Sequence, residues 1–179
     1  MLLSLKIHTV LIREKMKKIY IAGPDVFEKD SIAIGKKFSS LCAKYGFIGL
    51  YPMDNVVDFS QSKHKIASDI FKANVKMIDD ADIVIANLNS FRGKESDSGT
   101  VWECGYAFAQ GKKVYGYLKS SDAYIDQFSD KKERDGMFWD NEDRFIEDFE
   151  HPVNLMIASS CEEIIAGAFE DVLQKISDV

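Results

Sequence analysis

Proline, cysteine and long apolar runs are all scarce in this chain of 179 residues. It has three prolines and three cysteines, and no apolar stretch approaches the roughly 20 residues that a membrane-spanning helix needs. The apolar N-terminal stretch is interrupted by Lys6 and lacks a basic start and a small-residue cleavage site, so it does not resemble a signal peptide. We therefore expect a soluble protein, with residues 1–15 as an extension ahead of a single domain over residues 16–179.

Disulfide and metal-binding patterns are also missing. Cys42, Cys104 and Cys161 are odd in number, lie far apart and form no C-x-x-C pair, which disfavours both a disulfide framework and a zinc site. The three histidines show no ligand spacing. The sequence therefore predicts a protein of the reducing cytoplasm with no metal and no organic cofactor.

Positive charge is in deficit, and the deficit is local. The chain has 23 Lys and Arg against 29 Asp and Glu, for a net charge of −6, so neither nucleic acid nor an anionic membrane is an expected partner. Residues 119–151 contain five basic and eleven acidic residues and account for the whole excess. The six aromatic residues of this segment are too many for a free linker, so we predict an ordered, partly helical acidic excursion.

What the chain does contain is an alternation of strand and helix patterns. Short apolar runs rich in β-branched and aromatic residues predict strands over 18–22, 47–51, 82–87 and 113–117. Helical spacing of apolar residues predicts helices from Ser31 to Gly46, across 71–78, across 101–108 and across 164–176. This alternation indicates an α/β fold, a flavodoxin- or Rossmann-like open parallel sheet with helices on both faces.

Ligands of such sheets bind beyond the carboxyl ends of the strands. The loop after the first strand, Ala22-Gly23-Pro24-Asp25, has a glycine that either allows close approach to a ligand or makes a tight turn. It lacks both the G-x-G-x-x-G and the G-K-[ST] patterns, so a dinucleotide or triphosphate site is not indicated.

Two carboxylates follow the third strand. Asp97 lies in the loop and Glu103 near the start of the next helix, where a helix N-terminus favours an ionised side chain. Chemistry at a glycosidic bond requires such a pair, one to attack the anomeric carbon and one to protonate the leaving group. Thr100-x-x-Glu103 also fits a capping box, in which Glu103 would only stabilise the helix, and the spacing does not decide between the two.

The motifs resemble those of the nucleoside 2-deoxyribosyltransferase family. The stretch from Asp97 to Ala107, DSGTVWECGYA, is similar to the family signature. The runs KIYIAGP from Lys18, DADIVIANL from Asp80 and NLMI from Asn154 are similar to other family motifs and occur in the same order.

This resemblance implies a role for each matching residue. Glu103 would be the nucleophile that forms a 2-deoxyribosyl ester, Tyr20 would hold its carboxylate, and Asp97 would protonate the nucleobase. The remaining residues would bind substrate: Gly23, Phe27, Asn74, Gly99, Asn154 and Met156. Asn154 and Met156 would reach in from a neighbouring subunit, and Asn74 stands where some members carry a second base-side aspartate.

The function implied by the resemblance is a glycosyltransferase that moves 2-deoxyribose between nucleobases with retention of configuration. Its partners would be 2′-deoxynucleosides, free nucleobases and further copies of the chain, in a homo-oligomer with shared active sites. One alternative is a deoxynucleoside or deoxynucleotide N-glycosidase of the same superfamily, for which only Arg92 and Lys94 near the signature could hold a phosphate. The other is a non-catalytic nucleotide-sensing module in which Glu103 is only a cap.

Overall fold

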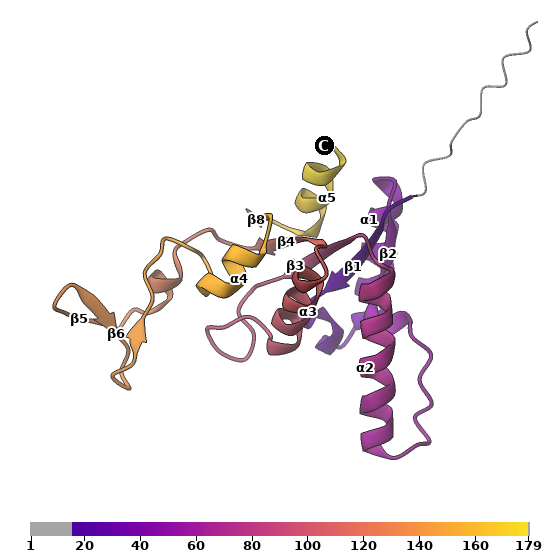
Figure 1. Cartoon of the computed structure of the whole chain (residues 1–179), viewed down its shortest axis with the longest axis horizontal. Coiled ribbons are helices and arrows are strands. Elements are labelled where there is room, and N and C mark those ends of the chain that lie inside the picture. Colours follow the sequence, from indigo (N-terminus) through magenta and orange to yellow (C-terminus); the bar gives the residue numbers. More distant parts are fainter. Residues whose placement is uncertain (1–15, 179) are drawn as a thin grey trace, which may run out of the picture.

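The computed structural model describes residues 16–178, so the predicted extension over 1–15 lies outside the described residues. Five parallel strands form the central sheet in the order β2-β1-β3-β4-β8 (Figure 1). Their bounds are β1 Lys18–Ala22, β2 Ile48–Leu50, β3 Ile83–Asn87, β4 Lys113–Leu118 and β8 Glu163–Ala166. This is the flavodoxin-like strand order, and it confirms the predicted fold class.

Helices cover both faces of the sheet, because side chains of each strand alternate between two hydrophobic clusters. Tyr20 and Ala22 point to the cluster that packs against α2, α3 and α4, whereas Ile19 and Ile21 point to the cluster under α1 and α5. The helix bounds are α1 Ser31–Lys44, α2 Lys63–Asp80, α3 Ser98–Ala109, α4 Leu155–Ser160 and α5 Phe169–Ser177. Two short 3₁₀ helices, η1 Pro24–Phe27 and η2 Pro52–Asp54, follow β1 and β2.

The prediction of one continuous helix over 164–176 is wrong. Ile164 and Ile165 belong to β8, which pairs in parallel with β4, and α5 begins only at Phe169. Asp171 accepts a hydrogen bond from the backbone N–H of Ala168 at 2.7 Å and so fixes the start of α5. The two isoleucines thus complete the sheet edge beside β4.

The buried face of α3 differs from the apolar spacing that predicted this helix. Thr100, Cys104 and Ala107 are the buried residues, whereas Phe108, part of the predicted stripe, is 56% exposed. The apolar spacing predicted the helix but not the face that packs on the sheet.

The acidic segment 119–151 is more sheet than helix. It contains one 3₁₀ helix, η3 Tyr124–Gln127, and a three-stranded antiparallel sheet of β5 Lys132–Arg134, β6 Met137–Trp139 and β7 Phe145–Ile146. Figure 1 shows the β5–β6 hairpin projecting away from the central sheet. The base of the segment is held where Tyr124 N–H donates to the carbonyl of His151 at 2.7 Å.

Within residues 16–178, no helix combines the length and apolar character needed to cross a membrane.

Candidate active site

The candidate site lies where the strand order changes direction, between β1 and β3. Parallel sheets of this order bind ligands at that point, beyond the carboxyl ends of the strands. β1 contributes Tyr20, the loop after β3 contributes Asp97, and α3 contributes Glu103. The structure therefore brings together the three residues predicted to be catalytic.

A short hydrogen bond joins two of them. The hydroxyl of Tyr20 donates to Glu103 Oε1 at 2.5 Å, although the residues are 83 positions apart in the chain. Tyr20 is fully buried under α3, so its ring is held in place by the core while its hydroxyl orients the carboxylate. The second carboxylate oxygen of Glu103 makes no hydrogen bond to any of residues 16–178.

Burial sets the charge state of this pair. It raises the pKa of Glu103 to about 7, with the hydrogen bond from Tyr20 opposing the rise and the nearby charge of Asp97 adding to it. Burial and the adjacent carboxylate also raise the pKa of Tyr20 far above its usual value, so Tyr20 stays a hydrogen-bond donor. The helix N-terminus was expected to favour an ionised Glu103. Glu103 is instead the sixth residue of α3, beyond the first turn, and burial dominates its pKa.

The capping-box alternative for Glu103 is also wrong. Asp97 is the N-cap of α3, and its Oδ2 accepts hydrogen bonds from the Thr100 N–H at 2.9 Å and the Thr100 hydroxyl at 3.0 Å. Thr100 lies inside the helix and Glu103 bonds to Tyr20, not to the helix start. The capping role therefore belongs to the first carboxylate of the pair.

An open pocket of about 310 Å³ lies beside the Glu103 carboxylate. It is lined by Phe71, Asn74, Gly99, Trp102 and Glu103. A Cβ at Gly99 would lie 3.1 Å from Asp97 Oδ2, so the missing side chain keeps the wall open next to the second carboxylate. Asn74 and Gly99, two of the residues predicted to bind substrate, thus both line the pocket beside Glu103.

Two pocket residues were missed by the sequence analysis as site residues. Phe71 was assigned to the apolar stripe of its helix, but it is 53% exposed and its ring lies 5.4 Å from that of Trp102. Trp102 stands within the signature, next to Glu103, and this adjacency was the one signal that could have identified it. Together the two rings form an aromatic wall of the pocket.

The predicted substrate contacts at Gly23 and Phe27 lie outside this lining. A Cβ at Gly23 would come within 2.8 Å of Asn87 Cβ and 2.5 Å of Asp25 Oδ2, so close packing of the β1 loop against β3 requires the glycine. Phe27 stacks on Phe91 with ring centroids 5.3 Å apart.

Asn154 and Met156 also lie apart from Glu103 within one chain. Asn154 is the N-cap of α4, where its Oδ1 accepts from the Met156 N–H at 3.0 Å. Both residues line a second pocket, of about 720 Å³, between α3 and α4, together with Val101 and Phe108.

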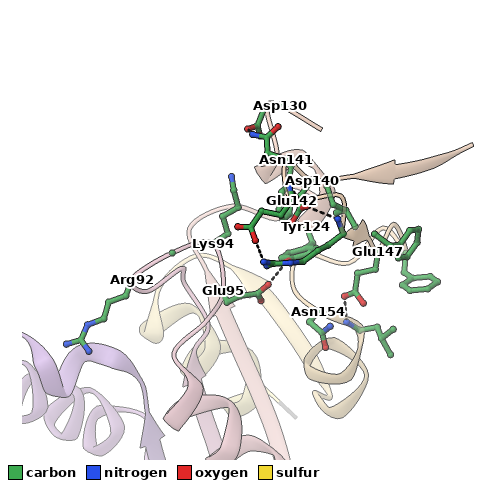
Figure 2. Close-up of a pocket in the computed structure, with 17 residues that line it drawn as sticks. Arg92, Lys94, Glu95, Tyr124, Asp130, Asp140, Asn141, Glu142, Glu147 and Asn154 are labelled. Carbon is green, nitrogen blue, oxygen red and sulfur yellow. Dashed lines mark hydrogen bonds and ion pairs between the residues drawn. The ribbon is translucent and has the colours of Figure 1, made fainter. Parts of the chain in front are cut away.

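A larger cavity, about 1030 Å³, lies between the acidic segment and the loop before α3. Its lining includes Asn154 but none of Tyr20, Asp97 and Glu103, and five of its residues are acidic. In Figure 2 Arg92 points away from the other labelled side chains, and its guanidinium lies over the rings of Phe27 and Phe91. This cavity therefore contains carboxylates, but none of the three residues predicted to be catalytic.

Cys104, next to the nucleophile candidate, is 1% exposed. Burial raises the pKa of its thiol, so it remains protonated and unreactive. Among residues 16–178, no group of three or more His, Cys, Asp or Glu side chains is arranged to hold a metal ion.

Fold and site together define a flavodoxin-like α/β protein with a tyrosine-held glutamate beside an aromatic pocket. The family model described as nucleoside 2-deoxyribosyltransferase matches residues 19–156. The chain belongs to this family.

Individual relatives agree with this assignment. A 2-desoxiribosyltransferase from Leishmania mexicana superposes with a TM-score of 0.73 at 30% identity, covering 90% of this chain and 97% of that one. A 2-deoxyribosyltransferase from Bacillus psychrosaccharolyticus shares the fold, with a TM-score of 0.58 at 21% identity and coverage of 87% and 90%.

A third relative is an uncharacterized protein of Schizosaccharomyces pombe, 29% identical over 113 residues, which are 62% of this chain. The match spans about half, 54%, of the length of that curated relative.

Proposed function

We propose that the protein transfers 2-deoxyribose between nucleobases by double displacement at Glu103. The free carboxylate oxygen attacks C1′ of a 2′-deoxynucleoside, the C1′–N bond breaks, and its electron pair leaves with the base. A nitrogen of the second base then attacks C1′ and loses its proton to Asp97, the ester C–O bond breaks, and the Glu103 carboxylate is restored. Two inversions at one carbon retain its configuration.

The hydrogen bond between Tyr20 and Glu103 is the observation that carries this proposal. It aims one oxygen of a largely buried carboxylate and leaves the other free beside the pocket. With a pKa of about 7, Glu103 is ionised in a large fraction of molecules at neutral pH, as a nucleophile requires. A glutamate with only a capping role would accept a hydrogen bond from a backbone N–H group at the start of the helix instead.

Asp97 is suited to serve the departing base. Its Oδ2 is occupied by the two hydrogen bonds to Thr100, whereas Oδ1 makes no hydrogen bond within the described part of the chain. In the proposed reaction, a proton on Oδ1 passes to the base nitrogen as the C1′–N bond breaks.

A nucleoside substrate fits the distribution of charge better than a nucleotide. Binding a 5′-phosphate calls for arginine or lysine beside the sugar, but Arg92 and Lys94 line the larger cavity and not the pocket of Glu103. Lys94 is engaged by the carbonyl of Gln127. We therefore rank a nucleoside transferase above a nucleotide hydrolase.

Base exchange tests the proposed function directly. The protein is incubated with 2′-deoxyguanosine and hypoxanthine, and then with thymidine and hypoxanthine, and the products are separated chromatographically. New 2′-deoxyinosine supports the transferase. Free base and sugar alone would indicate a hydrolase, and no change would indicate a sensing module.

Tyr20→Phe is expected to lower kcat/KM at pH 7 by about 10–100-fold, because a hydrogen bond to a charged group is lost. Since that bond opposes the raised pKa of Glu103, its removal should also shift the acid limb of the kcat/KM profile to higher pH. The loss should therefore be smaller at pH 9 than at pH 7. Tyr106→Phe, which removes a hydroxyl bonded to Asp79 at 3.0 Å, is the matched control, and an identical acid limb in both variants would contradict the role of Tyr20.

We further propose that the protein is a homo-oligomer in which Asn154 and Met156 complete a neighbour's site. Phe108 and Met156 are 56% and 72% exposed, and both line the groove between α3 and α4. Such an apolar surface is suited to a second copy of the chain. Asn154 and Met156 do not line the pocket of Glu103 within one chain. If a neighbouring subunit supplies them to that pocket, their place in a family motif is explained.

Mixing two inactive variants tests shared sites. Glu103→Ala and Asn154→Ala, unfolded and refolded together, should recover activity, because a hybrid dimer holds one site with both residues intact. Random pairing into dimers gives about one quarter of the wild-type rate. Each variant refolded alone is the control, and a mixture no more active than the controls would contradict the shared site.

The three cysteines are free, which supports the proposed cytoplasmic location.

A further inference from the structure

The orientation of the pocket residue Asn74 is fixed by a neighbour in the loop after β2. Asn55 Nδ2 donates to the backbone carbonyl of Pro52 at 3.0 Å and to Asn74 Oδ1 at 3.1 Å. A carbonyl oxygen only accepts, so the nitrogen of Asn55 must face Pro52. Because the same nitrogen faces Asn74, Asn74 must turn its oxygen toward Asn55.

This arrangement determines what Asn74 offers to a ligand. Its Oδ1 is occupied, and its Nδ2 has no hydrogen-bond partner among residues 16–178. Asn74 is half-buried and lines the pocket beside Glu103. The free end of Asn74 is therefore a pair of N–H donors, where an aspartate would offer only acceptors.

We propose that Asn55 and Asn74 make the site prefer 6-oxopurines, such as hypoxanthine and guanine, over the 6-aminopurine adenine. This inference rests on the proposed function. The edge of a 6-oxopurine presents two neighbouring acceptors, N7 and O6, whereas adenine presents the acceptor N7 and the donor N6–H₂. A proton on Asp97 can serve N7 while the Asn74 amide donates to O6.

Adenine would place its N6–H₂ donor against the N–H donors of Asn74. To accept from N6–H₂, Asn74 would have to turn over, which would set its own N–H groups against Asn55 Nδ2 and lose that hydrogen bond. A buried polar group left unpaired is costly, and we expect discrimination on the order of tenfold or more.

A competition between the two acceptor bases measures this preference. The protein receives 2′-deoxyguanosine with equal concentrations of hypoxanthine and adenine, and the initial rates of 2′-deoxyinosine and 2′-deoxyadenosine formation are compared. Their ratio does not depend on how much active protein is present. The wild type should form 2′-deoxyinosine at least about tenfold faster than 2′-deoxyadenosine.

Variants of Asn55 should change the ratio in two different ways. Asn55→Ala releases Asn74, so the ratio should fall toward one. Asn55→Asp offers an acceptor, so Asn74 should turn its N–H groups toward it, present Oδ1 to the pocket and bring the ratio below one. Gln61→Ala, which removes an amide of the same loop that donates to Asp58 at 2.9 Å, should leave the ratio unchanged.

A wild-type ratio near one, or a wild-type ratio kept by both Asn55 variants, would overturn the inference. If no base exchange occurs at all, the proposed transferase function fails, and calorimetric binding of free hypoxanthine and adenine to the wild type and to both variants gives the same comparison without turnover. Tighter binding of hypoxanthine that weakens in Asn55→Ala supports the inference; equal binding of the two bases overturns it.

Discussion

Glu103→Gln is expected to lower the rate of base exchange by about 10⁴-fold or more. A neutral amide cannot form the glycosyl ester, so the covalent route is lost. The substitution keeps the chain length and an oxygen that can still accept from the Tyr20 hydroxyl, a bond of 2.5 Å in the present structure. The loss should therefore appear in kcat without loss of the fold, as measured by initial rates and thermal melting.

Glu163→Gln is the matched control for this substitution. Glu163 is exposed on β8, far along the sheet from the site, and pairs with Lys175 at 3.1 Å. It should exchange bases at the wild-type rate. A Glu103→Gln protein that melts like a folded protein and exchanges bases within tenfold of the wild type would contradict the nucleophilic role.

The same Glu103→Gln variant is expected to be more stable than the wild type at alkaline pH. Burial raises the pKa of Glu103 from 4.5 to about 7, so folding favours its protonated form. The stability contributed by the neutral carboxyl group is present below about pH 4.5 and is lost as the pH rises through about 7. Glutamine is neutral throughout and avoids this loss, which amounts to about 3 kcal/mol above pH 8.

Thermal melts at pH 5 and pH 8 measure this gain. The melting temperature of Glu103→Gln should exceed that of the wild type by roughly 6–12 °C at pH 8, and by much less at pH 5. Glu163→Gln should show no such pH-dependent gain. An equal difference at both pH values would mean that Glu103 is not held in a desolvated site.

The inner strands β1 and β3 of the central sheet could be predicted because they are buried on both faces. Such strands appear in the sequence as short, nearly continuous apolar runs, as in residues 18–22 and 82–87. The edge strand β8 could not be separated from α5 in this way. Ile164 and Ile165 fall close enough to the spacing of Phe169 and Val172 to extend the helical pattern, and only pairing with β4 distinguishes them.

The strands of the acidic segment are even harder to recognise from their pattern of apolar residues. β5 is exposed along its whole length, and Met137 of β6 and Phe145 of β7 are also exposed. Ile146 is the one buried residue of these three strands, which is too few to make an alternation of apolar and polar residues that could be recognised. The aromatic content of the segment predicted an ordered, partly helical segment, but it could not predict the antiparallel sheet.

At the site, local spacing was ambiguous and long-range contacts decided the outcome. Thr100-x-x-Glu103 has the spacing of a capping box, yet the N-cap is Asp97, three residues before Thr100. The bond that separates the two interpretations joins Glu103 to Tyr20 across 83 positions. The contact between Asn55 and Asn74 joins a loop to a helix in the same way, and no motif in the sequence marks it.

Trapping the glycosyl-enzyme tests the central claim most directly. The wild type is mixed with a 2′-deoxynucleoside, quenched with acid during turnover, digested and examined by mass spectrometry. We expect one peptide to gain the mass of a 2-deoxyribosyl group, with fragmentation placing it on Glu103, and no gain in Glu103→Gln. An adduct on another residue, or full base exchange with no adduct at any quench time, would contradict the covalent role of Glu103.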